Sequence, residues 1–239
     1  MVQPSTVKRR LKPLLNEIVK AFQIWDDLNN DCFTVANSLV NTRLKERYVD
    51  HPELWPSELS PFSVTTTSKF PDLKQRYSEK LNDQISELAQ MFVRIFDKME
   101  THCLNKLHRS VSQVEMLYVE ACNTLGPDFC TSTPKHYARK QTYVINGIIL
   151  ISIQLVNHVK EILTMYAREI KFKHRIVKEE LLSKIKVREE GMVLLSSWLN
   201  QPSIDIERRS EIEEIWKVEM EGEEHEKTLI LDNPYLNKY

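Results

Sequence analysis

The sequence predicts an all-α protein: an elongated bundle of three long helices with a short C-terminal helical appendage, a flexible loop and an acidic tail. Glycine supplies only 4 of the 239 residues, against a usual share of about 7%, so few positions suit tight turns. Hydrophobic residues make up 41% and recur at helical spacing over long stretches. Charged residues make up 28%, and the formal net charge is −1. The chain can therefore bury a core, and its net charge gives no global attraction to nucleic acid or acidic membranes.

The first helix is predicted from Thr6 to Arg47. Its apolar seam advances by alternating steps of four and three, close to a heptad repeat, which is typical of a helix that packs against other helices. The seam residues are Leu11, Leu15, Ile18, Phe22, Trp25, Asn29, Cys32, Ala36 and Leu39. Asn29 is the polar member of this seam, and we interpret it as a residue that fixes the register of the packed helices.

A long loop and a second helix follow. Prolines and a Ser/Thr cluster predict the loop over residues 48–69. The second helix opens at FPDLKQR, with Pro71 in its first turn and Asp72 near its N-terminus. Its seam changes from four-three to four-four steps near Met99, which resembles a stutter, a local unwinding of any supercoil that the helix forms.

Gly126 and Pro127 lie at the centre of a predicted connection over 121–134. A third helix is predicted from Lys135 to Arg188, with Gly191 at its end or at a sharp turn. A short helix stopped by Pro202 and a last helix capped by Ser203 complete the pattern. We therefore expect one helical domain over 1–218 and a flexible acidic tail over 219–239.

Nothing in the sequence indicates a membrane or secretory protein. The most apolar stretch, residues 144–156, is shorter than the roughly 20 residues that a spanning helix needs, and we interpret it as a buried helix segment. The N-terminus lacks the apolar run of a signal peptide. The four cysteines include no CxxC pair, which is typical of reduced thiols inside cells. We expect a soluble, intracellular protein.

The sequence also indicates that the protein is not an enzyme. It has no Gly-rich phosphate loop and no Gly-x-Ser-x-Gly elbow. His158 lies on an apolar seam and is interpreted as a core histidine. Two groups contain metal-ligand residue types without a ligand pair at zinc spacing, namely His102 with Cys103, and Cys122 with Cys130 and His136. We expect no metal and no cofactor.

Charge is unevenly distributed near the C-terminus. Between Arg168 and Arg188, Lys and Arg outnumber Glu by eight to three. This segment predicts either a solvated helix face or a basic patch for RNA or an acidic protein surface. The residues of the predicted patch are Lys171, Lys173, Arg175 and Lys178.

Short linear patterns add three further candidates. Arg9 to Pro13 fits the loose Arg-x-Leu pattern by which cyclin partners dock, although Leu11 also belongs to the first seam. Ser60 and Thr133 each precede a proline in a predicted loop, so both are candidates for proline-directed phosphorylation.

Several stretches resemble known families. WDDLNNDCFTVANSLVN, from Trp25, and SSWLNQPSIDIERRSEIEEI, from Ser196, are similar to the cyclin-dependent kinase 2-interacting protein (CINP) family. FPDLKQR, from Phe70, resembles the related AIRIM family, and MYAREIKFKHRIVKEEL, from Met165, is similar to both.

The resemblance implies an adaptor. Members of these families are helical subunits that partner each other on a hexameric AAA+ ATPase. That assembly acts in maturation of the large ribosomal subunit and in clearing replisome proteins. The partners implied are a sister helical subunit, the ATPase, pre-60S particles and a cyclin-dependent kinase, in the nucleus and the cytoplasm. The expected interface anchors, which would otherwise fill the chain's own core, are Trp25, Phe70, Tyr166 and Trp198.

Three other functions stay open at this stage. The chain could be a scaffold for cyclin-dependent kinase and checkpoint proteins, an RNA-binding helical protein, or a coiled-coil homodimer. Steep salt dependence of RNA affinity would indicate the second, and a concentration-dependent dimer without a partner would indicate the third.

Overall fold

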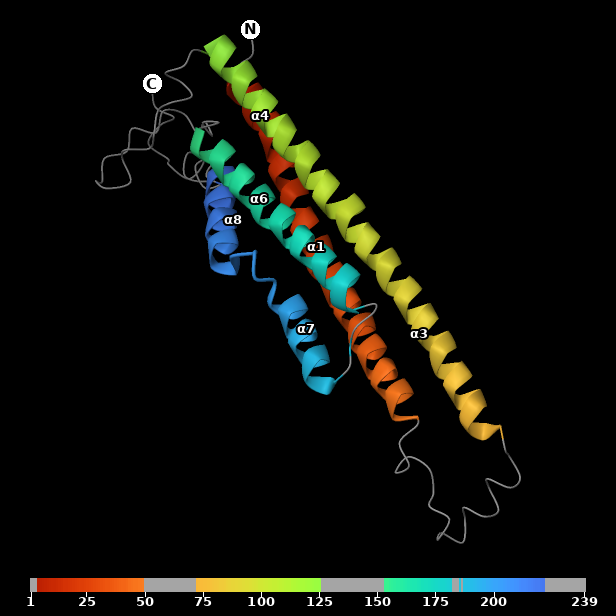
Figure 1. Ribbon diagram of the computed structural model, residues 1–239. Coiled ribbons are helices and arrows are strands. Elements are labelled where there is room, and N and C mark those ends of the chain that lie inside the picture. Colours follow the sequence, from red (N-terminus) through yellow and green to blue (C-terminus); the bar gives the residue numbers. More distant parts are fainter. Residues whose placement is uncertain (1–3, 50–71, 126–152, 182–184, 186, 222–239) are drawn as a thin grey trace, which may run out of the picture. The chain divides into compact units, whose positions relative to one another are not determined.

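The computed structural model describes residues 4–49, 72–125, 153–181, 185 and 187–221. Within these ranges the secondary structure is helical, without a strand, which confirms the all-α class (Figure 1). The elements in chain order are α1 (Pro4–Tyr48), α3 (Leu73–Lys98), the π-helix η2 (Met99–Leu104), α4 (Asn105–Leu125), α6 (Ile153–Arg175), the π-helix η3 (Ile176–Leu181), α7 (Arg188–Asn200) and α8 (Ile206–Glu221).

The first helix agrees closely with its prediction. α1 runs from Pro4 to Tyr48, and every residue of the predicted seam is buried. Asn29 is only 2% exposed, so the polar member of the seam lies inside the protein with its apolar neighbours.

The predicted stutter near Met99 coincides in position with a π-helical turn. α3 ends at Lys98 and α4 begins at Asn105, and the π-helix η2 lies between them. A π-helical turn adds a residue to the turn and so rotates the faces of the helix that follows it. Met99 and Cys103 within η2 are both fully buried, so the changed spacing keeps apolar side chains directed inward.

Two predicted helix ends are wrong. Gly191 does not end a helix but lies within α7, in the turn that follows Arg188. Ser203 does not cap the last helix; Asp205 does, because its Oδ1 accepts a hydrogen bond from the backbone N–H of Arg208 at 2.9 Å. The predicted third helix is described only as α6 and η3, and its first half lies outside the described residues.

The chain divides into two compact units. The first comprises residues 1–23, 102–167 and 204–239. Its buried side chains include Leu11, Leu15, Ile18, Leu107, Val114, Ile162 and Trp216. The ring of Phe22 stacks on that of Tyr166 at 5.3 Å between centroids, and Arg209 donates a hydrogen bond to the Tyr166 hydroxyl at 3.0 Å. Arg208 donates two hydrogen bonds of 3.0 Å to Glu161, so α8 is held on α6.

The second unit comprises residues 24–101 and 168–203. Its buried side chains include Trp25, Leu39, Phe92, Phe96, Ile170, Leu194 and Trp198. Trp198 of α7 lies 5.1 Å from Phe92 and 5.9 Å from Phe96, centroid to centroid, with both pairs edge-to-face. This aromatic cluster joins α7 to α3.

The C-terminal helices differ from the predicted appendage. Trp198 of α7 and Trp216 of α8 are 1% and 0% exposed, so each helix supplies a large side chain to the core of its unit. The prediction of a single domain over 1–218 stays a prediction.

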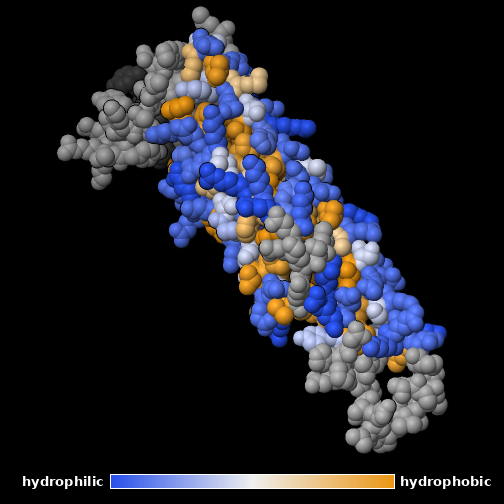
Figure 2. Space-filling view, in the orientation of Figure 1, coloured by the Kyte–Doolittle hydropathy of each residue, from blue (hydrophilic) through white to orange (hydrophobic). Residues whose placement is uncertain are grey.

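Hydrophilic residues cover most of the described surface in the view of Figure 2, with hydrophobic residues among them. None of the helices in the described part of the chain is both long and apolar enough to cross a bilayer.

Candidate functional site

Lys173 lies inside the second unit, which corrects the predicted basic patch. Its side chain is fully buried, whereas Lys171, Arg175 and Lys178 are exposed. The reason is helical geometry: Lys173 follows buried Glu169 by four residues and shares its inward face, whereas Lys171 and Arg175 lie on the outward side of α6.

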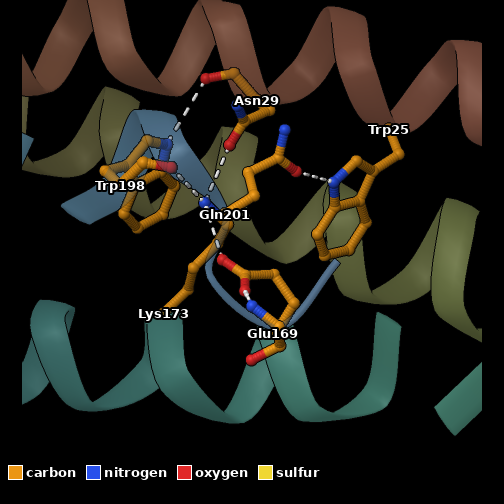
Figure 3. A network of polar contacts seen from close by, with 7 residues as sticks. Trp25, Asn29, Glu169, Lys173, Trp198 and Gln201 are labelled. Carbon is orange, nitrogen blue, oxygen red and sulfur yellow. Dashed lines mark hydrogen bonds and ion pairs between the residues drawn. The ribbon is translucent and has the colours of Figure 1, made fainter. Parts of the chain in front are cut away.

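The ammonium group of Lys173 is held by several partners (Figure 3). Its Nζ donates to Asn29 Oδ1 at 2.8 Å and to the backbone carbonyl of Trp198 at 2.8 Å. The same atom lies 3.3 Å from Glu169 Oε1 and 4.0 Å from the centroid of the Trp198 ring. Because an unpaired buried charge is very costly, this combination of oxygens and an aromatic face is what allows the lysine to be buried.

Burial shifts the acid–base properties of the site. It lowers the pKa of Lys173 from 10.5 to about 8, and the carboxylate of Glu169 opposes that shift. Burial also raises the pKa of the nearby Cys32 thiol to about 12, against a smaller opposing effect of Lys173. Cys32 is therefore a protonated, unreactive thiol at neutral pH.

The same network fixes the C-terminal end of α7 and the segment after it. Gln201, which has a left-handed backbone with φ 46°, accepts a hydrogen bond from Trp25 Nε1 at 2.6 Å. The backbone N–H of Ser203 donates to Glu169 Oε2 at 2.9 Å, and Trp198 Nε1 donates to the carbonyl of Asn29 at 3.4 Å. The positive charge of Lys173 beside a carbonyl of the last turn is also favourable to the helix dipole. These contacts set the position of α7 against α1 and α6.

The predicted interface anchors are core residues where the structure describes them. Trp25 and Tyr166 are 0% exposed and Trp198 is 1% exposed, which agrees with the alternative that they fill the chain's own core. Phe70 lies outside the described residues.

Sequence reasoning did not find a groove between α1 and α7, within the second unit. It has a volume of about 320 Å³. Its apolar lining includes Met192 and Leu199, which are 56% and 46% exposed. The lining residues are Phe33, Asn37, Val40, Asn41 and Leu44 from α1, and Arg188, Met192, Leu195, Ser196 and Leu199 from α7.

A second hollow of about 370 Å³ lies along α7 and shares Met192 and Ser196 with the groove. Val193 also lines it and is 64% exposed, the most exposed large hydrophobic residue of α7. The outward side of α7 thus carries apolar side chains that the described part of the chain leaves largely uncovered.

The α1–α7 groove depends on a close approach at Gly191. A Cβ added there would lie 2.5 Å from Val40 Cγ1, well inside van der Waals contact. Glycine is therefore required at this position because the two helices meet there. The groove and the network around Lys173 are both formed by α1 and α7, so the network holds the walls of the groove.

The structure gives no support to the remaining candidate sites from the sequence, where it describes their residues. Leu11 of the Arg-x-Leu pattern is fully buried, so it does not present a docking surface in this conformation. Within the described ranges no group of three His, Cys, Asp or Glu side chains is arranged to hold a metal ion. Cys130, His136, Ser60 and Thr133 lie outside the described residues.

His158 titrates below its usual range. Burial lowers its pKa, Arg208 adds to the shift, and Glu161 opposes it. Its Nδ1 atom is buried without a hydrogen-bond partner in the described structure. His158 is thus only partly buried and lies beside charged groups of Arg208 and Glu161, so it differs from the core histidine that its seam position predicts.

The chain is similar in sequence to a known protein of Xenopus laevis. No protein-family model matches the chain. The chain is 27% identical over 183 residues to the Cyclin-dependent kinase 2-interacting protein of Xenopus laevis, which covers 76% of this chain and 73% of that protein. The match supports the first of the two resemblances drawn from the sequence motifs, and the AIRIM resemblance stays a prediction. Over about three quarters of its length, the chain is thus similar to a cyclin-dependent kinase 2-interacting protein.

Proposed function

We propose that this protein is a non-enzymatic scaffold that binds other proteins, and that the α1–α7 groove is one of its docking sites. The groove supports this most directly, because it combines uncovered apolar side chains with walls held in place by buried polar contacts. Exposed apolar surface next to a rigid framework is typical of protein-binding sites.

The shape of the groove suits a helix of a partner protein. On α1 the lining residues fall at steps of three and four from Phe33 to Leu44, and on α7 from Arg188 to Leu199. Such steps place side chains in a row along one helix face. Each row extends over about 16 Å at 1.5 Å per residue, enough for roughly three turns of a third helix lying between the two.

The lining also defines the chemistry of that helix. Met192, Leu195 and Leu199 offer apolar contact for side chains spaced at i, i+3 or i+4, and i+7. Arg188 is exposed and has no ion-pair partner in the described structure, so it suits a carboxylate of the partner. An amphipathic helix with an acidic residue near one end is the occupant that these side chains fit.

Two sources suggest the identity of the partners. The Xenopus laevis relative is named for an interaction with cyclin-dependent kinase 2, and we propose a cyclin-dependent kinase as one partner. The sequence motifs support a more specific role as an adaptor, with a sister helical subunit, on a AAA+ ATPase. That adaptor would act in maturation of the large ribosomal subunit and in genome maintenance, in the nucleus and cytoplasm.

Affinity purification of the tagged full chain, with quantitative mass spectrometry, tests both the role of the groove and the identity of the partners. We expect Met192→Glu/Leu199→Glu to reduce the recovery of groove-bound partners by roughly tenfold or more, because charge is buried at an apolar contact. The matched control is Met116→Glu/Val119→Glu, which alters residues that are 72% and 55% exposed on α4.

Equal recovery of every partner with both variants would show that the groove is not a docking site. Recovery of neither a AAA+ ATPase nor a cyclin-dependent kinase with the unaltered chain would contradict the two proposed identities. Circular dichroism of each variant checks that the helices are retained.

A further inference from the structure

A row of exposed basic side chains runs along α6 and η3 in the second unit. Arg168, Lys171 and Arg175 follow one another at i, i+3 and i+7 on α6, and Lys178 lies three residues later in η3. All four side chains are exposed. None forms an ion pair or a hydrogen bond with a residue that the structure describes. We call these four residues the basic row.

Among the side chains that the structure describes, two acidic groups near the basic row are already paired with other residues. Glu169 is buried against Lys173, and Glu100 of η2 lies 3.3 Å from His174 Nε2. Like charges three or four residues apart destabilise a helix, and the dipole at the C-terminal end of α6 favours only the cations of its last turn. The basic row therefore carries repulsion that a ligand of opposite charge would remove.

We propose that the basic row binds an acidic helical segment of a partner protein, whose carboxylates recur at i, i+3 or i+4, and i+7. This surface is separate from the α1–α7 groove and does not depend on what fills it. Arginine pairs with carboxylates in a two-pronged arrangement, and lysine acts as a point charge. Carboxylates at helical spacing on a second helix match cations at helical spacing on α6.

The same observations disfavour RNA. The row is one side chain wide and extends over about 15 Å at 1.5 Å per residue, whereas nucleic-acid sites spread cations across several phosphates of the backbone. Single-stranded RNA also requires exposed rings for base stacking. The two tryptophans of this unit that the structure describes, Trp25 and Trp198, are buried, and Phe172 beside the row is partly buried. A formal net charge of −1 adds no general attraction.

Fluorescence anisotropy with the full chain tests the proposal. The probe is a labelled helical peptide of alanine and glutamine with glutamates along one face, and a second peptide of the same composition has its glutamates spread around the helix. We expect the first peptide to bind more tightly, and its affinity to fall with added salt. We expect Arg168→Gln/Lys171→Gln/Arg175→Gln/Lys178→Gln to weaken its binding about tenfold, since exposed ion pairs contribute little singly but add together in a network.

The matched control is Arg76→Gln/Lys80→Gln/Arg94→Gln/Lys98→Gln, which removes the same charge from exposed positions of α3 and is expected to leave binding unchanged. Equal binding of both peptides, or an equal effect of both variants, would overturn the proposal. So would tighter binding of a single-stranded RNA oligonucleotide that the basic-row variant abolishes. Salt-sensitive self-association of the chain that the same variant removes would instead assign the row to a second copy. Circular dichroism of both variants checks whether they keep their helices.

Discussion

At the level of single residues, the buried ammonium group of Lys173 connects three helices of the second unit. Taking a charge out of water costs several kcal/mol, and here the cost is offset by Glu169, Asn29 and the carbonyl of Trp198. These partners come from α1, α6 and α7. The lysine is therefore stable in this position only while all three helices are in place.

Replacing Lys173 by methionine should destabilise the protein strongly. The change leaves Glu169 as a buried charge without its partner, and breaking a buried pair in this way typically costs about 3–5 kcal/mol in the free energy of unfolding. Urea denaturation followed by circular dichroism measures the loss. Glu169→Gln/Lys173→Met should recover part of it, because the glutamine amide is neutral and still offers an oxygen to Ser203 N–H. If Lys173→Met were as stable as the unaltered chain, this account of the network would be disproved.

The stability that depends on Lys173 should rise with pH. Its pKa is 10.5 when unfolded and about 8 in the folded chain, so between these values the unfolded chain binds more protons. The free energy of unfolding then increases with pH, by at most about 1.4 kcal/mol per unit from this group. Below about pH 8 both states are protonated and the contribution is flat. Denaturation curves of the unaltered chain and of Lys173→Met across this pH range isolate the contribution of Lys173. If the difference between their free energies of unfolding falls as the pH rises, the prediction is contradicted.

At the level of helices, α7 is positioned by a close contact at one end and by polar bonds at the other. Gly191 lets its first turns approach Val40 of α1, and the bonds of Trp198 and Gln201 hold its last turn. Sequence patterns place Gly191 at a helix end because glycine is common there. Its use within a helix follows from the proximity of α1, which local sequence does not encode.

Gly191→Ala should weaken the contact between α7 and α1. The new methyl group would meet Val40 Cγ1, and overpacking of this kind typically costs about 1–3 kcal/mol, which exceeds the gain of about 1 kcal/mol from helix propensity. Thermal unfolding should show a lower midpoint for Gly191→Ala. Gly191→Ala/Val40→Ala should be more stable than the sum of the two single changes predicts, because the second change makes room for the first. Strictly additive effects would mean that the two side chains do not meet.

The irregular turn in the second long helix shows a feature that local sequence does predict. The seam spacing changes near Met99, and η2 begins at that residue. A change in the repeat of apolar residues must be matched by a change in helix winding if the same face is to stay buried. The spacing therefore contains the information, and no distant contact is needed to deduce it.

At the scale of the whole molecule, the polar network connects residues that are far apart in the sequence. Asn29 and Trp198 are separated by 169 positions and Lys173 and Asn29 by 144. The sequence indicated Asn29 as a polar residue in an apolar seam, and its burial confirms that position. The sequence predicts a surface position for its partner Lys173, because this residue lies among other basic residues and composition does not distinguish the two faces of α6.

The sequence by itself determined the all-α class, the extent of α1, the stutter near Met99 and the apolar seams, because helical periodicity is a local property. Only the tertiary structure decided that Lys173 is buried while Lys171 and Arg175 are exposed, that Gly191 lies in a helix contact, and that α1 and α7 form a groove. These features depend on which helix faces meet, and that follows from contacts between distant segments rather than from neighbouring residues.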